Sequence, residues 1–124
     1  MIFNGTKRIE TDRLVLDKLK EEDYESIMKN IFENKEIAKT YMLPTFNNEE
    51  QKKSFFNRLI HGYQNPRFYF WTIKIKNSNE VIGIINTVNI DDNRNEIEIG
   101  YCINPYHWNN GYATEACKNV IDFL

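Results

Sequence analysis

The amino-acid sequence predicts one α+β domain, a mixed α/β layer protein over residues 1–124 with the order β-α-α-β-β-β-α. Apolar residues recur with a helical period in 24–32, 55–63 and 113–124, and they alternate with polar residues in the segments between. Three successive strands joined by short turns are typical of an antiparallel meander. We therefore expect a mainly antiparallel sheet flanked by helices.

The first half of the chain is expected to form one strand and two helices. Apolar residues alternating with charged ones predict a strand over 8–19. The buried face of the first helix is expected to contain Tyr24, Ile27, Met28, Ile31 and Phe32. Segment 34–46 fits no single pattern, and Asn47 with Glu50 then resembles a capping box that opens the second helix. Its buried face is expected to contain Phe55, Phe56, Leu59, Ile60 and Tyr63.

The second half is expected to form three strands and a final helix. Alternation in 71–75 predicts a strand with one buried face, and apolar residues of both parities in 81–90 predict a central strand. A further alternating strand covers 97–103, and polar turns at 77–80 and 91–95 join the three. The buried face of the last helix is expected to contain Ala113, Ala116, Cys117, Val120, Ile121 and Leu124.

Composition excludes several classes of protein. The net charge is −2 with acidic and basic residues interleaved, so the chain lacks the overall basic character typical of nucleic-acid-binding proteins, and we expect no nucleic-acid partner. It has no apolar run of the length of a membrane span and no signal-peptide pattern, which predicts a cytoplasmic protein. Cys102 and Cys117 lack the spacing of metal ligands, and we expect reduced thiols and no metal site.

The segment 98–116, EIGYCINPYHWNNGYATEA, joins a strand to a helix through an elaborate loop. The first N–H groups of a helix have no partner within the helix and lie at the positive end of its dipole, which suits a phosphate. Gly111 would allow a ligand to approach closely, and Ala113 keeps the first turn uncrowded. The alternative is that Asn and Gly simply cap the helix.

Two longer stretches resemble a known superfamily. IETDRLVLDKLKEEDYESI and EIEIGYCINPYHWNNGYATEACKNVIDF together resemble the GCN5-related N-acetyltransferases (GNAT), and within them the ribosomal-protein N-terminal acetyltransferase-like branch. The motif positions in the first stretch are Thr11, Arg13, Leu14, Leu16, Leu19 and Asp23. Those in the second are Glu98 to Tyr101, Ile103, Pro105, Trp108 and Gly111 to Ala116.

The resemblance implies that acetyl-CoA is the cofactor. The backbone amides that hold its pyrophosphate in the family correspond to a segment with Trp108 where the general signature has Gln or Arg. That segment contains Trp108, Asn109, Asn110, Gly111, Tyr112, Ala113 and Thr114. The end of the preceding strand would pair with the pantetheine arm through Tyr101, Cys102 and Ile103. A strand edge suits an arm that carries amides.

The resemblance also implies transfer of an acetyl group to a primary amine by direct attack. The acceptor would be a protein N-terminus or a small amine. Glu98 matches the family position of the glutamate that accepts the amine proton, often through water. The alternative for Glu98 is a solvent-facing residue beside Glu96 on a polar strand face.

The similarity ends at Leu124, inside the third helix of the family fold, so the sequence predicts a GNAT-like fold without its C-terminal strands. A truncated chain, a second chain that completes the sheet and a natural short form are the three explanations. Because the last strand would leave an open edge, we expect a homodimer that covers it. The alternative function is a catalytically incomplete remnant that binds acetyl-CoA or dimerises.

Overall fold

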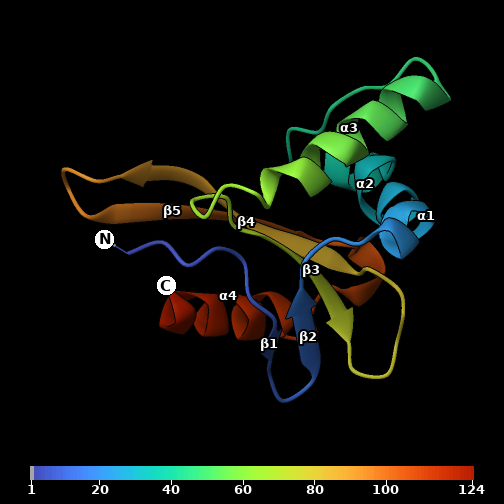
Figure 1. Ribbon diagram of the computed structural model, residues 1–124. Coiled ribbons are helices and arrows are strands. Elements are labelled where there is room, and N and C mark those ends of the chain that lie inside the picture. The colour runs from blue at the N-terminus through green and yellow to red at the C-terminus, as the bar shows by residue number, and fades with distance from the viewer. Residues whose placement is uncertain (1) are drawn as a thin grey trace.

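The computed structural model describes residues 2–124 and contains a five-stranded sheet in the order β1-β2-β3-β4-β5 (Figure 1). Every neighbouring pair is antiparallel, which confirms the predicted α+β meander. The strands are β1 (Ile9–Glu10), β2 (Leu14–Asp17), β3 (Phe70–Ile75), β4 (Gly83–Asp91) and β5 (Glu96–Ile103). The helices are η1 (Glu21–Asp23), α1 (Tyr24–Ile27), η2 (Met28–Phe32), α2 (Lys35–Ala38), α3 (Glu49–Gly62), η3 (Pro105–His107) and α4 (Tyr112–Phe123).

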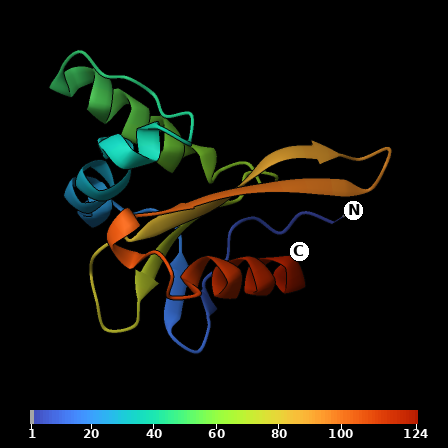
Figure 2. The ribbon, with the colours of Figure 1, turned by 180° about the vertical axis from the view of Figure 1, so that it is seen from behind.

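The sheet separates two apolar cores (Figures 1 and 2). Helices α1 to α3 cover one face, where Ile27, Ile31 and Phe56 pack with Phe70 and other residues of the sheet. Helix α4 covers the opposite face with Ala116 and Val120. Both layers reach the end of β5, so that end receives side chains from the two sides of the sheet. No helix within residues 2–124 combines the length and apolar character needed to cross a membrane.

The expected strand over 8–19 is wrong, because the chain forms a tight hairpin there. The amide of Thr11 donates to Leu14 O at 2.9 Å and closes a turn between β1 and β2. The Thr11 hydroxyl accepts from Leu14 N at 2.9 Å and strengthens that turn. Residues 10–13 are all polar, and the apolar positions change parity between Ile9 and Leu14, so the interrupted alternation was the signal of the reversal.

Two helix predictions need correction. The apolar face over 24–32 is buried as expected, but it combines α1 with a wider π turn, η2. The capping box at Asn47 and Glu50 is wrong by one residue: Asn48 is the N-cap, and its side chain accepts from Gln51 N at 2.8 Å. Asn47 lies outside the helix, and its amide donates to the Gln51 side chain.

Two burial predictions also fail. Strand β3 was expected to have one buried face, but it lies in the middle of the sheet and its first four residues are buried on both faces. Thr72 is accommodated there because its hydroxyl donates to Asp17 O at 3.1 Å. On α4, Ile121 and Leu124 were expected in the core but are 61% and 39% exposed.

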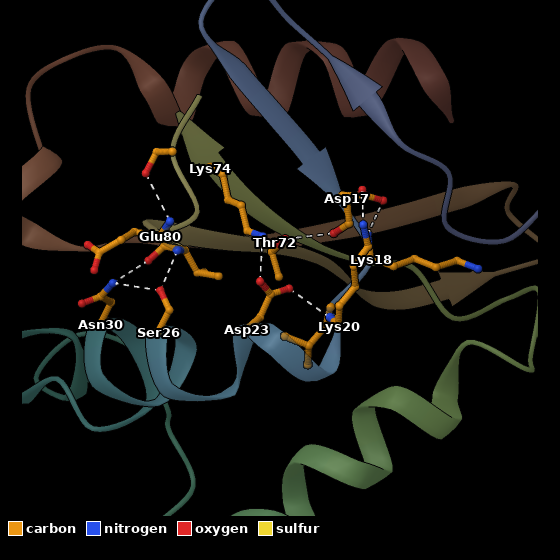
Figure 3. Close-up of polar contacts among 12 residues, drawn as sticks. Asp17, Lys18, Lys20, Asp23, Ser26, Asn30, Thr72, Lys74 and Glu80 are labelled. Carbon is orange, nitrogen blue, oxygen red and sulfur yellow. Dashed lines mark hydrogen bonds and ion pairs between the residues drawn. The ribbon is translucent and has the colours of Figure 1, made fainter. Parts of the chain in front are cut away.

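A buried ion pair joins the first helical segment to the sheet (Figure 3). Asp23 is 1% exposed, and its carboxylate lies 2.6 Å from Lys74 Nζ on β3 and accepts from Lys20 N at 3.0 Å. Nearby, the Ser26 hydroxyl accepts from Val81 N at 2.7 Å. These bonds join α1 to β3 and to the segment just before β4, because a buried carboxylate is costly without hydrogen-bonding or charged partners.

We predict that Asp23→Ala lowers the free energy of unfolding by about 3 kcal/mol, since it leaves the Lys74 ammonium largely buried without a partner. Urea denaturation at pH 7 measures this change. Glu22→Ala is the matched control, because Glu22 is an exposed neighbour and its loss should change stability by less than about 0.5 kcal/mol. Equal effects of the two substitutions would contradict the role assigned to Asp23.

Candidate active site

The loop between β5 and α4 is built by polar side chains that bond to its own backbone. Asn104 caps η3, where its Oδ1 accepts from Tyr106 N at 3.0 Å. The Trp108 indole N–H donates to Ile103 O at 2.7 Å and holds the loop against the strand end. Asn110 Nδ2 donates to two carbonyls of the same loop. The loop is therefore shaped by its asparagines and Trp108, which explains its unusual composition.

The start of α4 presents a run of free backbone amides. Within the described residues, the amides of 109–114 donate to no protein acceptor, and the first bond of the helix is Glu115 N to Gly111 O at 3.0 Å. The backbone is left-handed at Asn109 (φ 65°) and Gly111 (φ 77°) but not at the residue between them. Alternation of this kind turns successive N–H groups toward one centre, a geometry that binds anions.

The outer edge of β5 offers a second set of main-chain groups. Asn104 N donates to Ile82 O at 2.7 Å. Asn104 and Ile82 therefore form a hydrogen-bonded pair that continues the β4–β5 ladder one residue beyond the strand ends. Because such pairs alternate with non-bonded ones, the main chain of Cys102 faces β4, whereas those of Tyr101 and Ile103 face away. In the sheet that residues 2–124 form, β5 has no neighbour on this side.

Two adjoining pockets lie along the start of α4 and the end of β5. One, of about 300 Å³, surrounds the start of α4, and the other, of about 260 Å³, lies between the end of β5 and the segment after α2. Ile103, Trp108 and Ala113 line both, so the two form one cleft. The cleft is lined by every residue that the sequence predicted for the cofactor: Tyr101, Cys102, Ile103, Trp108, Asn109, Asn110, Gly111, Tyr112, Ala113 and Thr114.

Glu98, the predicted base, lies outside the lining of both pockets. It is exposed on β5 opposite Asn89, on the same strand face as Gly100 and Cys102. Burial raises the pKa of the Cys102 thiol to about 12. The Cys102 thiol therefore stays protonated at neutral pH, which argues against a nucleophilic cysteine.

Glu115 is a site residue whose contacts the sequence did not reveal. Its carboxylate accepts hydrogen bonds from the Thr11 hydroxyl, from Arg13 N at 2.9 Å and from Arg13 Nε at 2.7 Å. The Arg13 guanidinium also lies over the Tyr112 ring at 4.5 Å, and a Cβ on Gly111 would lie 3.3 Å from Arg13 Nη2. These contacts, which we call the Glu115 clasp, join the β1–β2 turn to the start of α4.

The clasp keeps the Glu115 carboxylate ionised. Burial alone would raise its pKa, but the hydrogen bonds from Thr11 and Arg13 outweigh burial and hold the pKa below its usual value. Thr11, Arg13 and Glu115 all belong to the sequence motifs quoted above. The presence of these three residues in the motifs of the two stretches was the signal that could have indicated a contact between segments about a hundred residues apart.

We predict that Glu115→Gln lowers the free energy of unfolding by about 1 kcal/mol at pH 7, because one of the donors loses its acceptor. A carboxyl with a lowered folded pKa stabilises the fold above its unfolded value of about 4.3, and this contribution is lost as the pH falls through the folded pKa. The difference from wild type should therefore shrink toward pH 3 in urea titrations. A constant difference across this range would contradict the proposed charge effect.

Comparison with known proteins identifies a relative that is longer than this chain. The chain is 34% identical over 115 residues to a Bacillus subtilis protein named as the uncharacterized N-acetyltransferase YoaA. That alignment covers 93% of this chain and 64% of YoaA. The chain therefore spans less than two thirds of the length of this curated relative.

Solved acetyltransferases share the fold. The microcin C7 self-immunity acetyltransferase MccE, solved in complex with acetyl-CoA and AMP, matches with a TM-score of 0.75 and 24% identity over 90% of this chain and 62% of its own. RimL, the ribosomal L7/L12 α-N-protein acetyltransferase, matches with a TM-score of 0.77 and 17% identity over 94% and 64%. A family model described as the acetyltransferase (GNAT) domain matches residues 13–124. The chain therefore belongs to the GNAT acetyltransferase domain family.

Proposed function

We propose that this chain binds acetyl-CoA in the cleft and that the protein transfers its acetyl group to a primary amine. The observation that carries the proposal is the run of free amides over 109–114 beside the open edge of β5. Membership of the GNAT family supports it, as does the acetyl-CoA bound in the related fold of MccE.

The residues of the cleft fit the chemistry of this ligand. Converging amides at a helix N-terminus suit the pyrophosphate, because they offer donors and the positive end of the helix dipole. The outward main-chain groups of Tyr101 and Ile103 suit the pantetheine arm, whose amides can pair with a strand edge. The Trp108 indole N–H donates to Ile103 O, so this outward-facing carbonyl already accepts one hydrogen bond. The Trp108 side chain also lines both pockets where they adjoin.

Glu98 is the proposed acceptor of the amine proton. Acetyl-CoA, when bound, supplies a thioester carbonyl carbon that a neutral amine can attack. Glu98 is exposed and lies outside the cleft lining, so we propose that water carries the proton to it. Its position on the same strand face as Gly100 and Cys102 directs it toward the layer of α1 to α3 rather than toward α4.

The acceptor is proposed to be a protein N-terminus or a small amine. RimL carries the name of an α-N-protein acetyltransferase for ribosomal L7/L12, which supports the first of these. At 17% identity this relationship extends to the fold alone, so a panel of peptides and small amines is the suitable set of probes.

We predict that acetyl-CoA binds the chain measurably by isothermal titration calorimetry and that thiol release appears with an amine from the panel. Glu98→Gln should lower turnover by about 100-fold and leave binding unchanged, because it removes a proton acceptor and no ligand contact. Glu96→Gln is the matched control, since Glu96 is exposed on the same strand face.

The outcomes separate the two readings of the domain. Binding without thiol release from any amine would favour a catalytically incomplete acetyl-CoA-binding remnant. Equal losses in the two variants would remove Glu98 from the mechanism. A wild-type chain that binds no acetyl-CoA at millimolar concentration would contradict the proposed function as a whole.

A further inference from the structure

Tyr41 brings a hydroxyl to the end of the cleft from the opposite layer of the fold. It lies just after α2, in a segment whose residues fit no single periodic pattern, and its side chain is partly buried. It lines the 260 Å³ pocket together with Ile37 and Thr40, facing Tyr101 and Cys102 on β5. The lining at this end is largely apolar, which leaves few groups able to satisfy a buried oxygen of a ligand.

The Tyr41 hydroxyl lies against β5 at Gly100. A Cβ at Gly100 would lie 3.7 Å from the Tyr41 hydroxyl oxygen, 3.7 Å from Asn86 Oδ1 and 2.8 Å from Val88. A Cβ at Gly100 would thus clash with Val88 and would lie in van der Waals contact with the Tyr41 hydroxyl, which places that hydroxyl directly against this position of β5. Gly100 pairs with Asn86 in the β4–β5 ladder and lies between Glu98 and Cys102 on the same strand face.

The Tyr41 hydroxyl holds only a weak bond to the protein. Its one partner among the described residues is Asn86 Oδ1 at 3.4 Å, whereas an O–H···O bond is ordinarily about 2.7–2.8 Å long. Burial, with a smaller effect of the Cys102 thiol, raises the pKa of Tyr41. The hydroxyl therefore keeps its proton at neutral pH and can donate it to a better acceptor in the pocket.

We propose that Tyr41 is a catalytic residue whose hydroxyl donates a hydrogen bond to the carbonyl oxygen of the bound acetyl thioester. The proposal rests on the proposed function, because it needs acetyl-CoA in the cleft. The converging amides lie at one pocket and Tyr41 at the other, so a ligand with its phosphates at α4 extends its far end toward Tyr41. The oxygen then replaces Asn86 Oδ1 as the partner of the hydroxyl.

This bond would assist the reaction at a defined atom. As the C–N bond forms, the carbonyl oxygen would gain negative charge, and the amine proton would pass through water to Glu98. The electron pair on the oxygen would re-form the carbonyl as the C–S bond breaks, and the sulfur would leave as a thiolate that solvent protonates. A hydroxyl fixed in an apolar pocket stabilises that charge more than water does. Tyr41 keeps its own proton throughout, which agrees with a phenol that resists ionisation.

The test compares acetyl-CoA with CoA, which lacks the acetyl group. We predict that Tyr41→Phe weakens binding of acetyl-CoA by about 3- to 10-fold and leaves binding of CoA unchanged, as expected for the loss of one hydrogen bond. Turnover should fall by about 10- to 100-fold. Tyr24→Phe is the control: Tyr24 lies on α1, lines neither pocket and should leave both affinities unchanged.

Several results would overturn the assignment. If Tyr41→Phe weakens acetyl-CoA and CoA equally, the side chain packs against the arm and does not contact the carbonyl. If the Tyr41→Phe variant binds acetyl-CoA and CoA as tightly as the wild type does, and the wild type is active, then Tyr41 does not contact the acetyl group. The proposed function would stand in that case. If wild type binds neither ligand, both proposals fail. Circular dichroism of the Tyr41→Phe variant confirms folding, and Asn86→Ala, which keeps the hydroxyl, should retain the wild-type preference for acetyl-CoA.

Discussion

The Glu115 carboxylate is the contact on which the arrangement of the cleft depends. It receives hydrogen bonds from Thr11 and Arg13, and it thereby fixes the first turn of α4 to the hairpin at the opposite end of the sequence. A free carboxylate in that turn would repel an anion from the helix start. Paired with Arg13, its charge is offset, and the amides of 109–114 remain available to a phosphate.

The cleft changes in character along its length because it lies where both layers of the fold meet one strand end. Helix α4 supplies amides and a positive dipole end on one side of β5. The segment after α2 supplies Ile37, Thr40 and Tyr41 on the other. The pyrophosphate is thus proposed to bind at one end of the cleft and the thioester to react at the other. The edge of β5 between them sets the distance between the two ends.

Short-range patterns in the sequence predicted the later strands and the last helix, and the resemblance to the GNAT family implied the ten cofactor residues that line the cleft. Strands β3 to β5 are joined by short polar turns, so their pairing follows from local signals. The contacts of Glu115 and the placement of Tyr41 were not predicted, because each depends on partners far away in the sequence. The hairpin at Thr11 was also missed, although the bonds between Thr11 and Leu14 that close it are local. Alternation and period identify a buried face, but they do not identify its partner.

Amide hydrogen exchange tests the central claim most directly. The amides of 109–114 have no acceptor among residues 2–124 and should exchange rapidly in the free chain. Saturating acetyl-CoA should slow their exchange by at least about tenfold and protect the Tyr101 and Ile103 amides as well, while the β1–β2 hairpin changes little. Binding of acetyl-CoA with no added protection at 109–114 would contradict the account, because the ligand would then lie elsewhere.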